Sequence, residues 1–108
     1  MKPTSDQMAL PGLDGKGEQR MADARAWVDA HPEEFGWYKA NARRECAKPH
    51  DGKASPNRCI YGMRITFGIE LPNYLAPYLA RIAMEQDPSI RMRVARSDAD
   101  CYTTAVLK

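Results

Sequence analysis

Apolar residues recur at steps of three and four along much of the chain, and this is the period of an amphipathic helix. The first helical segment begins at Gln19 and should end near His31, because Pro32 follows it. Pro32 can itself open a second helix, with Glu33 and Glu34 well placed at the positive end of the helix dipole. The apolar stripe of this second helix follows Phe35, Tyr38, Ala42 and Cys46.

Two further helices and some strand are indicated after residue 54. Ser55 followed by Pro56 is an N-cap and a first-turn proline, so a short third helix should begin there and change to a strand near Arg64. A fourth helix should lie between Pro72 and Pro88. The alternation typical of a strand appears twice, first at Ile65, Phe67, Ile69 and Leu71, then at Ile90, Met92 and Val94.

This order of elements predicts an α+β fold that is mostly helical, with four helices, one short strand and a C-terminal β-hairpin. The hairpin would be completed by residues 102–107, which are rich in Thr and Val. Several helices followed by a hairpin is the plan of winged helix-turn-helix domains, although a strand between the third and fourth helices is not standard there. Residues 1–18 contain many Pro, Gly and small polar residues, so we expect a flexible N-terminal arm before one small domain at 19–108.

Charge is distributed unevenly along a chain whose formal net charge is only +2. Residues 39–64 carry seven Lys/Arg and two Asp/Glu, whereas residues 1–38 carry four and seven. Such asymmetry indicates an anionic partner. The three cysteines form no even disulfide set, and neither a secretory signal nor a membrane-spanning stretch is apparent, so we expect a cytoplasmic protein without a membrane partner.

The basic middle of the chain supplies most of the candidate binding surface. Trp37, Arg44 and Lys48 share the side of the second helix that faces away from its apolar stripe. Arginine and lysine neutralise phosphates, and an exposed tryptophan is a stacking platform. In the predicted hairpin, Arg91 and Arg93 would point to one face and lie beside a phosphate backbone. The candidate contacts to nucleic acid or another partner are Trp37, Arg43, Arg44, Lys48, Arg58, Arg91 and Arg93.

Structural explanations stay open for the same residues. The helix face could simply be solvated, with Trp37 covered by the N-terminal arm or the first helix. The arginines of residues 91–93 could protect an edge strand from aggregation. Both alternatives require no ligand.

Metal binding and catalysis have weaker support. Cys46, His50 and Cys59 form a C-x3-H-x8-C arrangement that His31 or Cys101 could complete, but the spacing matches no well-known zinc module. A buried thiol explains Cys46 without metal, so we predict neither a metal nor a cofactor. No P-loop, G-x-S-x-G or H-E-x-x-H motif is present, and a polar turn accounts for the aspartates near residue 100. We therefore expect that the protein is not an enzyme.

The second half of the chain carries a family resemblance. The run N-Y-L-A-P-Y-L-A-R at residues 73–81, then Pro88 and R-V-A-R-S-D-A-D at residues 93–100, resembles a pattern in uncharacterised small proteins of bacteriophages and prophages. In those proteins a helix with aromatic residues precedes a strand ending in Asn, a P-x-x-A-R helix and an R-x-S-x-x-D close. The similarity extends over residues 27–100, with one Asn here where the pattern often has two. It implies an origin in a mobile element and nothing about chemistry.

Three functions are compatible with the sequence. The first is a phage- or prophage-encoded regulator that binds nucleic acid, DNA rather than RNA, through the basic surface. The second is an inhibitor that binds a host defence nuclease such as a CRISPR effector, using the acidic residues of the first two helices, Asp23, Asp29, Glu33 and Glu34. The third is a homodimeric structural or assembly protein that pairs its terminal strand across a two-fold axis.

Overall fold

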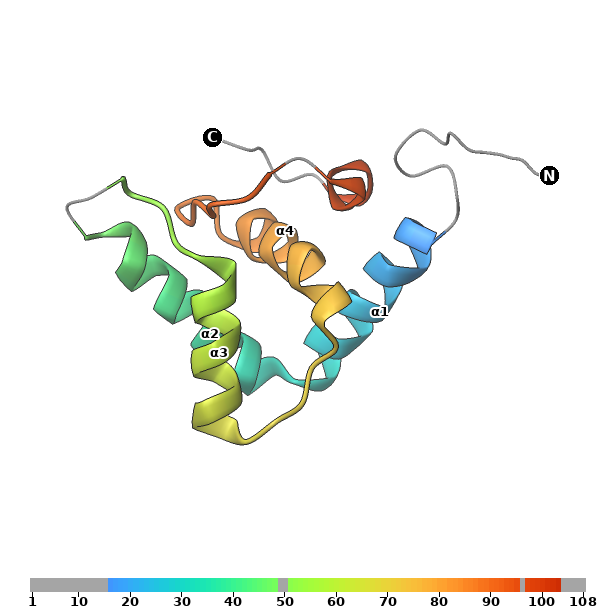
Figure 1. The fold of residues 1–108 in the computed structure, drawn as a ribbon, viewed down its shortest axis with the longest axis horizontal. Helices are drawn as coiled ribbons and strands as arrows, with labels where there is room; N and C mark the ends of the chain where they lie inside the picture. Colours follow the sequence, from blue (N-terminus) through green and yellow to red (C-terminus); the bar gives the residue numbers. More distant parts are fainter. Residues whose placement is uncertain (1–15, 49–50, 96, 104–108) are drawn as a thin grey trace.

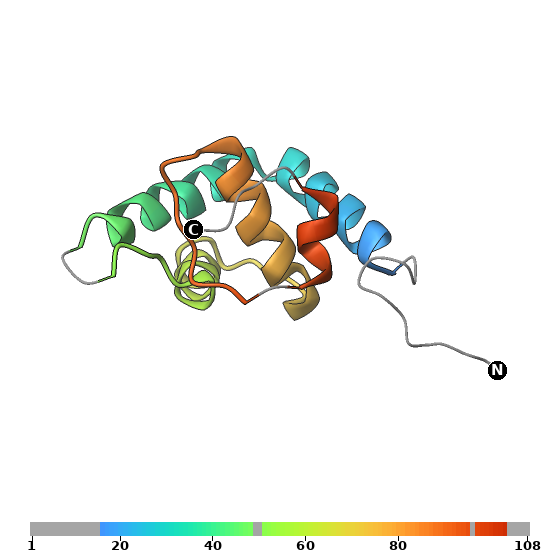
Figure 2. The ribbon, with the colours of Figure 1, turned by 90° about the horizontal axis from the view of Figure 1, so that it is seen from above.

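A computed structural model describes residues 16–48, 51–95 and 97–103 of the protein, without the side chain of Asp98. Its body is four α-helices, α1 (Lys16–Ala30), α2 (Pro32–Cys46), α3 (Pro56–Phe67) and α4 (Ala76–Gln86) (Figure 1). Two short 3₁₀ helices accompany α4, η1 (Asn73–Leu75) before it and η2 (Asp98–Tyr102) after it. Figure 2 shows α1 and α2 following one another along the molecule, with α4 and η2 lying on one side of them.

The helix starts follow the sequence signals. α2 begins at Pro32, as expected. Ser55 caps α3, because its hydroxyl accepts a hydrogen bond from the Arg58 N–H at 3.3 Å, and Pro56 occupies the first turn. α1 begins at Lys16, so residues 16–18 belong to this helix and not to the predicted arm. The rest of the predicted arm, residues 1–15, lies outside the described residues.

The strand predicted at residues 65–71 is wrong. Ile65 and Phe67 belong to α3, which ends where Gly68 adopts a left-handed backbone with φ 65° and donates its N–H to the Arg64 carbonyl at 2.7 Å. The apolar residues of α3 also fit a helical period, and the helix prevails because a glycine cap is available at its end. Residues 69–72 then cross to η1 without pairing to any described segment as a strand.

The predicted C-terminal β-hairpin is wrong as well. Ala54 pairs with the segment around Met92 in a single parallel bridge, in which the Ala54 N–H donates to Arg91 and the Arg93 N–H donates to Ala54. Residues 98–102 form η2 where a turn and a returning strand were expected, and residues 104–107 lie outside the described residues. The part of the chain that the structure describes contains no strand. It is therefore not a winged helix. Tyr102 also does not belong to an edge strand that could pair across a dimer.

α4 is the centre of the core. Every residue from Tyr78 to Met84 is buried, and α1, α3 and both 3₁₀ helices pack around it. The other helices bury one side each against α4 or each other, through residues such as Met21, Phe35, Tyr38 and Met63. None of the described helices has the length and apolarity needed to cross a membrane.

Arg81, on α4, is buried and fastens the C-terminal segment to the core. Its Nε and Nη2 donate to the two carboxylate oxygens of Asp100 at 2.9 and 3.2 Å. The guanidinium also donates to the carbonyls of Pro77 at 3.2 Å and Ala95 at 2.6 Å. Asp100 in turn accepts the Ser97 N–H at 3.0 Å within a capping box. We call this network the Arg81 clasp; it holds η2 against α4.

Candidate functional site

A continuous groove follows the side of the molecule between α2 and α3. It consists of three adjoining hollows of about 440, 590 and 100 Å³, and Glu45 and Arg58 line all three of them. Five of the seven candidate residues line this groove: Trp37, Arg44, Lys48, Arg58 and Arg93. The groove therefore brings together side chains from α2, the following loop, α3 and the segment after α4.

Local contacts explain why these segments meet. Glu45, near the end of α2, accepts the Ser55 N–H at 3.1 Å and so holds the start of α3 beside α2. The Cys46 thiol donates to the Arg91 carbonyl at 3.2 Å and accepts the Arg91 N–H at 3.3 Å. Together with the bridge from Ala54 to Met92, these contacts hold the end of α2 and the start of α3 beside the segment after α4. The cationic residues of these segments are thereby brought together.

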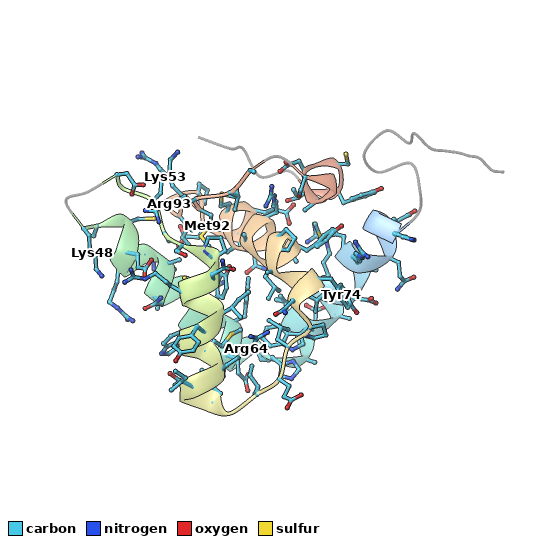
Figure 3. All side chains as sticks on the ribbon, viewed as in Figure 1. Lys48, Lys53, Arg64, Tyr74, Met92 and Arg93 are labelled. Atoms are coloured by element: carbon cyan, nitrogen blue, oxygen red, sulfur yellow. The ribbon has the colours of Figure 1, made fainter. Side chains whose placement is uncertain are left out.

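We name this end of the molecule the basic end and define it by six cations: Arg44, Lys48, Lys53, Arg58, Arg91 and Arg93. Lys48, Lys53 and Arg93 project at the same end, away from Arg64 and Tyr74 (Figure 3). Arg91 belongs with them because its guanidinium lies close to Gly52 in the same loop.

The basic end holds two internal ion pairs and four other cations. Arg58 pairs with Glu45 at 3.1 Å, and Arg93 pairs with Asp51 at 2.9 Å. Among the described residues, no carboxylate lies within ion-pair distance of the remaining four, which are Arg44, Lys48, Lys53 and Arg91. Within the described ranges, the Arg44 guanidinium donates only to the amide oxygen of Asn41, at 2.7 Å. The positive charge of this end is therefore only partly neutralised within the protein.

Trp37 does not project into solvent, although its place on the helical wheel predicted that it would. Its ring is half-buried and lies against Gly62 of α3, where an added Cβ would approach the ring to 2.6 Å. It also meets Phe67 in a perpendicular contact with centroids 6.4 Å apart. The ring is thus partly covered by α3, and it lines one hollow of the groove.

Tyr61 is the exposed aromatic residue of the groove, and the sequence pattern did not identify it. Its side chain is 67% exposed on α3, one turn before Ile65, which is similarly exposed. Both lie on the side of α3 opposite the buried Cys59 and Met63. A helical pattern continued past Arg64 would have revealed this face; the strand predicted from that point concealed it.

Arg43 lies apart from the groove. It points toward the end of α4, where its guanidinium donates to Asp87 at 2.7 Å. The Ser89 hydroxyl and the Arg43 guanidinium hold the pKa of Asp87 below its usual value. Arg43 is therefore engaged in an ion pair between helices, unlike its neighbour Arg44.

The Cys59 thiol serves packing. Cys59 is fully buried and accepts a hydrogen bond from the Asn41 amide at 3.4 Å, and burial raises the pKa of its thiol to about 11. A group of three side chains suited to a metal is not found within the described ranges, and His50, part of the zinc alternative, lies outside them. Asp100, one of the aspartates attributed to a polar turn, is bound in the Arg81 clasp.

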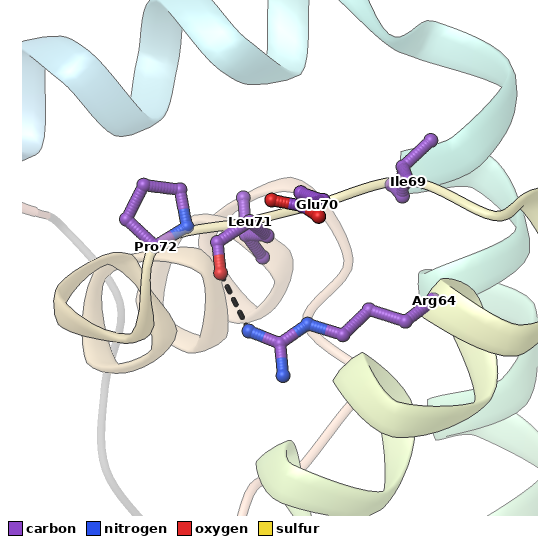
Figure 4. Close-up of a pocket in the computed structure, with 5 residues that line it drawn as sticks. All are labelled: Arg64, Ile69, Glu70, Leu71 and Pro72. Atoms are coloured by element: carbon purple, nitrogen blue, oxygen red, sulfur yellow. Dashed lines mark hydrogen bonds between the residues drawn. The ribbon is translucent and has the colours of Figure 1, made fainter.

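A separate hollow of about 570 Å³ lies beneath the loop from α3 to η1 (Figure 4). Its cation, Arg64, donates to the Leu71 carbonyl and to the Asn73 amide oxygen at 3.0 Å. These bonds hold the loop and occupy the guanidinium. The groove beside the basic end is thus the better candidate for a ligand.

Comparisons of this chain with protein-family models, curated protein sequences and solved structures found no match. The groove offers cations, side-chain amides and two aromatic rings. These groups suit recognition of an anionic ligand that also has flat, hydrogen-bonding faces.

Proposed function

We propose that the protein binds the phosphate backbone of nucleic acid through its basic end, as a binding protein and not as an enzyme. One observation carries the proposal: Arg44, Lys48, Lys53 and Arg91 converge from separate segments without a carboxylate partner in the described structure. Converging cations raise the local potential, and each phosphate contact releases counterions from the nucleic acid.

The charge at the basic end comes from side chains. α2 ends there with the negative end of its dipole, and α3 begins there with the positive end of its own. These two contributions oppose each other. The local carboxylates, Glu45 and Asp51, are bound to Arg58, the Ser55 N–H and Arg93, so the other four cations are available for phosphates.

The test is binding of the purified protein to fluorescently labelled DNA and RNA at two salt concentrations. We expect affinity in roughly the micromolar range that falls steeply with salt, with DNA bound more tightly than RNA. The double variant Arg44→Glu/Lys48→Glu should weaken binding by more than tenfold and lower the salt slope by about one for each phosphate that the variant can no longer bind.

Arg20→Glu provides the control for the single variant Arg44→Glu, because both change the net charge by the same amount. Arg20 is exposed on α1, outside the basic end, and lies over the Tyr74 ring with 5.5 Å between guanidinium carbon and centroid. It should leave the affinity within about twofold, since distant surface charges are screened at physiological salt. Equal losses in the two variants would reduce the effect to net charge, and no binding at low salt would overturn the proposal.

A further inference from the structure

We infer that the hollow between α2 and α3 accommodates an unstacked base, so that the ligand of the basic end is single-stranded nucleic acid with Tyr61 as its stacking platform. This inference rests on the proposed function, because the cations hold the strand while the hollow selects its form. It adds a base-binding role for residues that carry no charge.

The hollow continues directly from the cations. Arg58 and Glu45 belong both to the hollow beside Arg44 and Lys48 and to the hollow beside Tyr61. A strand whose phosphates meet Arg44 and Lys48 would therefore bring its next base to Tyr61. Bases of a single strand alternate with phosphates along a flexible backbone, which suits this neighbouring arrangement.

The hollow beside Tyr61 has the groups that a base requires. Tyr61 presents its ring to solvent, and the half-buried Trp37 lines the same hollow against Gly62. Because Gly62 has no side chain, α3 approaches the Trp37 ring closely and the hollow keeps a flat aromatic lining. Base–aromatic stacking contributes about 1–3 kcal/mol per base and tolerates any base.

Asn57 adds hydrogen-bonding capacity. Its amide is exposed in the first turn of α3 and makes no hydrogen bond within the part of the chain that the structure describes. A side-chain amide can donate to and accept from the edge of a base. The other amide of the hollow, Asn41, is already bound to Cys59 and Arg44.

The single-stranded form follows from the stacking group. In a duplex, each base is stacked on its neighbours and paired, so its face cannot reach a ring on a helix surface. Duplex binding would involve the cations alone, and Tyr61 and Asn57 would make no contact with the ligand. The two forms of ligand therefore predict opposite outcomes for a Tyr61 variant.

The experiment measures affinities for a labelled oligothymidine, an oligouridine of the same length and a matched DNA duplex. Tyr61→Ala should weaken binding of both single strands by about five- to a hundred-fold, which corresponds to the 1–3 kcal/mol of stacking, and leave duplex binding unchanged. Tyr61→Phe should retain the affinity, because it keeps the ring. Since Tyr61 is exposed, its replacement should leave the unfolding midpoint nearly unchanged, and this is measured for each variant.

Ile65→Ala is the matched control, because Ile65 is equally exposed on the same face but has no aromatic ring. It should bind the single strands like the parent protein. Equal losses for Tyr61→Ala and Ile65→Ala would indicate an apolar contact and overturn the base-stacking role.

The outcomes separate the two proposals. If Tyr61→Ala has no effect on single strands while Arg44→Glu/Lys48→Glu abolishes binding, the base site is wrong and the phosphate-binding function stands. If the parent protein binds none of the three ligands at low salt, both proposals are wrong.

Discussion

The Arg81 clasp and the basic end use the same kind of side chain in opposite ways. Arg81 is 1% exposed and its guanidinium is surrounded by a carboxylate and two carbonyls. Arg44 is exposed, and the amide oxygen of Asn41 is the only acceptor for its guanidinium among the residues that the structure describes. A buried charge must be paired and hydrogen-bonded, whereas an exposed charge is solvated by water and stays available to a ligand. The difference in burial therefore assigns one arginine to folding and leaves the other available for binding.

The largest expected effect that separates the two regions is the loss of stability on replacing Asp100. Asp100→Asn removes the charge that neutralises buried Arg81 and should destabilise the protein by about 3–5 kcal/mol, the usual result of orphaning a buried charge. Urea unfolding followed by circular dichroism measures the loss. The matched exposed pair is Arg93 and Asp51 at the basic end, where Asp51→Asn should cost less than about 1 kcal/mol.

Replacing both partners of the clasp tests whether the unpaired buried charge causes the loss of stability in Asp100→Asn. Arg81→Met with Asp100→Leu should recover much of the stability lost in Asp100→Asn, because no buried charge remains unpaired. A loss for Asp100→Asn no greater than that for Asp51→Asn would contradict the distinction between the two regions.

A smaller effect is expected where the groove depends on close packing. In Gly62→Ala the new methyl would lie 2.6 Å from the Trp37 ring, so the ring or α3 must shift, at a cost of about 1–3 kcal/mol. Gly36→Ala is the control, since nothing lies within 4 Å of its added Cβ and a helix-interior alanine should stabilise by about 0.5–1 kcal/mol. Thermal unfolding measures both. Similar midpoints would show that Trp37 moves freely and that the hollow has no fixed lining.

How far the fold could be predicted depends on whether a signal is local. The prolines at 32 and 56 marked helix starts correctly, because capping and first-turn preferences act within a few residues. The alternation around Met92 was real, since Met92 is buried and both flanking arginines are exposed. The predicted partner strand for Met92 was wrong. Ala54 pairs with Met92 from 38 residues away, and the Arg81 clasp holds the following chain as η2.

The candidate site shows the same limit. The helical wheel placed Arg44 and Lys48 on one side of α2, and both line the groove. It could not show that Arg43 pairs with Asp87, because that contact joins α2 to the residue that follows α4, far away in the sequence. Tyr61 was missed for a different reason: the predicted change to a strand near Arg64 ended the helical face before Ile65 could extend it.

The smallest expected effect separates two neighbours on α2. Arg43→Ala breaks an exposed ion pair and should cost less than about 1 kcal/mol, measured by urea unfolding, while nucleic-acid affinity changes little.

A carboxyl whose folded pKa lies below its unfolded value stabilises the fold above that value and loses the contribution as pH falls. Asp87 is held low by Ser89 first and Arg43 second, so Arg43→Ala should weaken but not remove its share of the stability lost below about pH 4. Arg44→Ala should do the reverse, with unchanged acid sensitivity and weaker binding, because Arg44 has no described carboxylate to lose. If instead Arg43→Ala weakens binding as strongly as Arg44→Ala does, internal pairing does not decide which cations are available to a ligand.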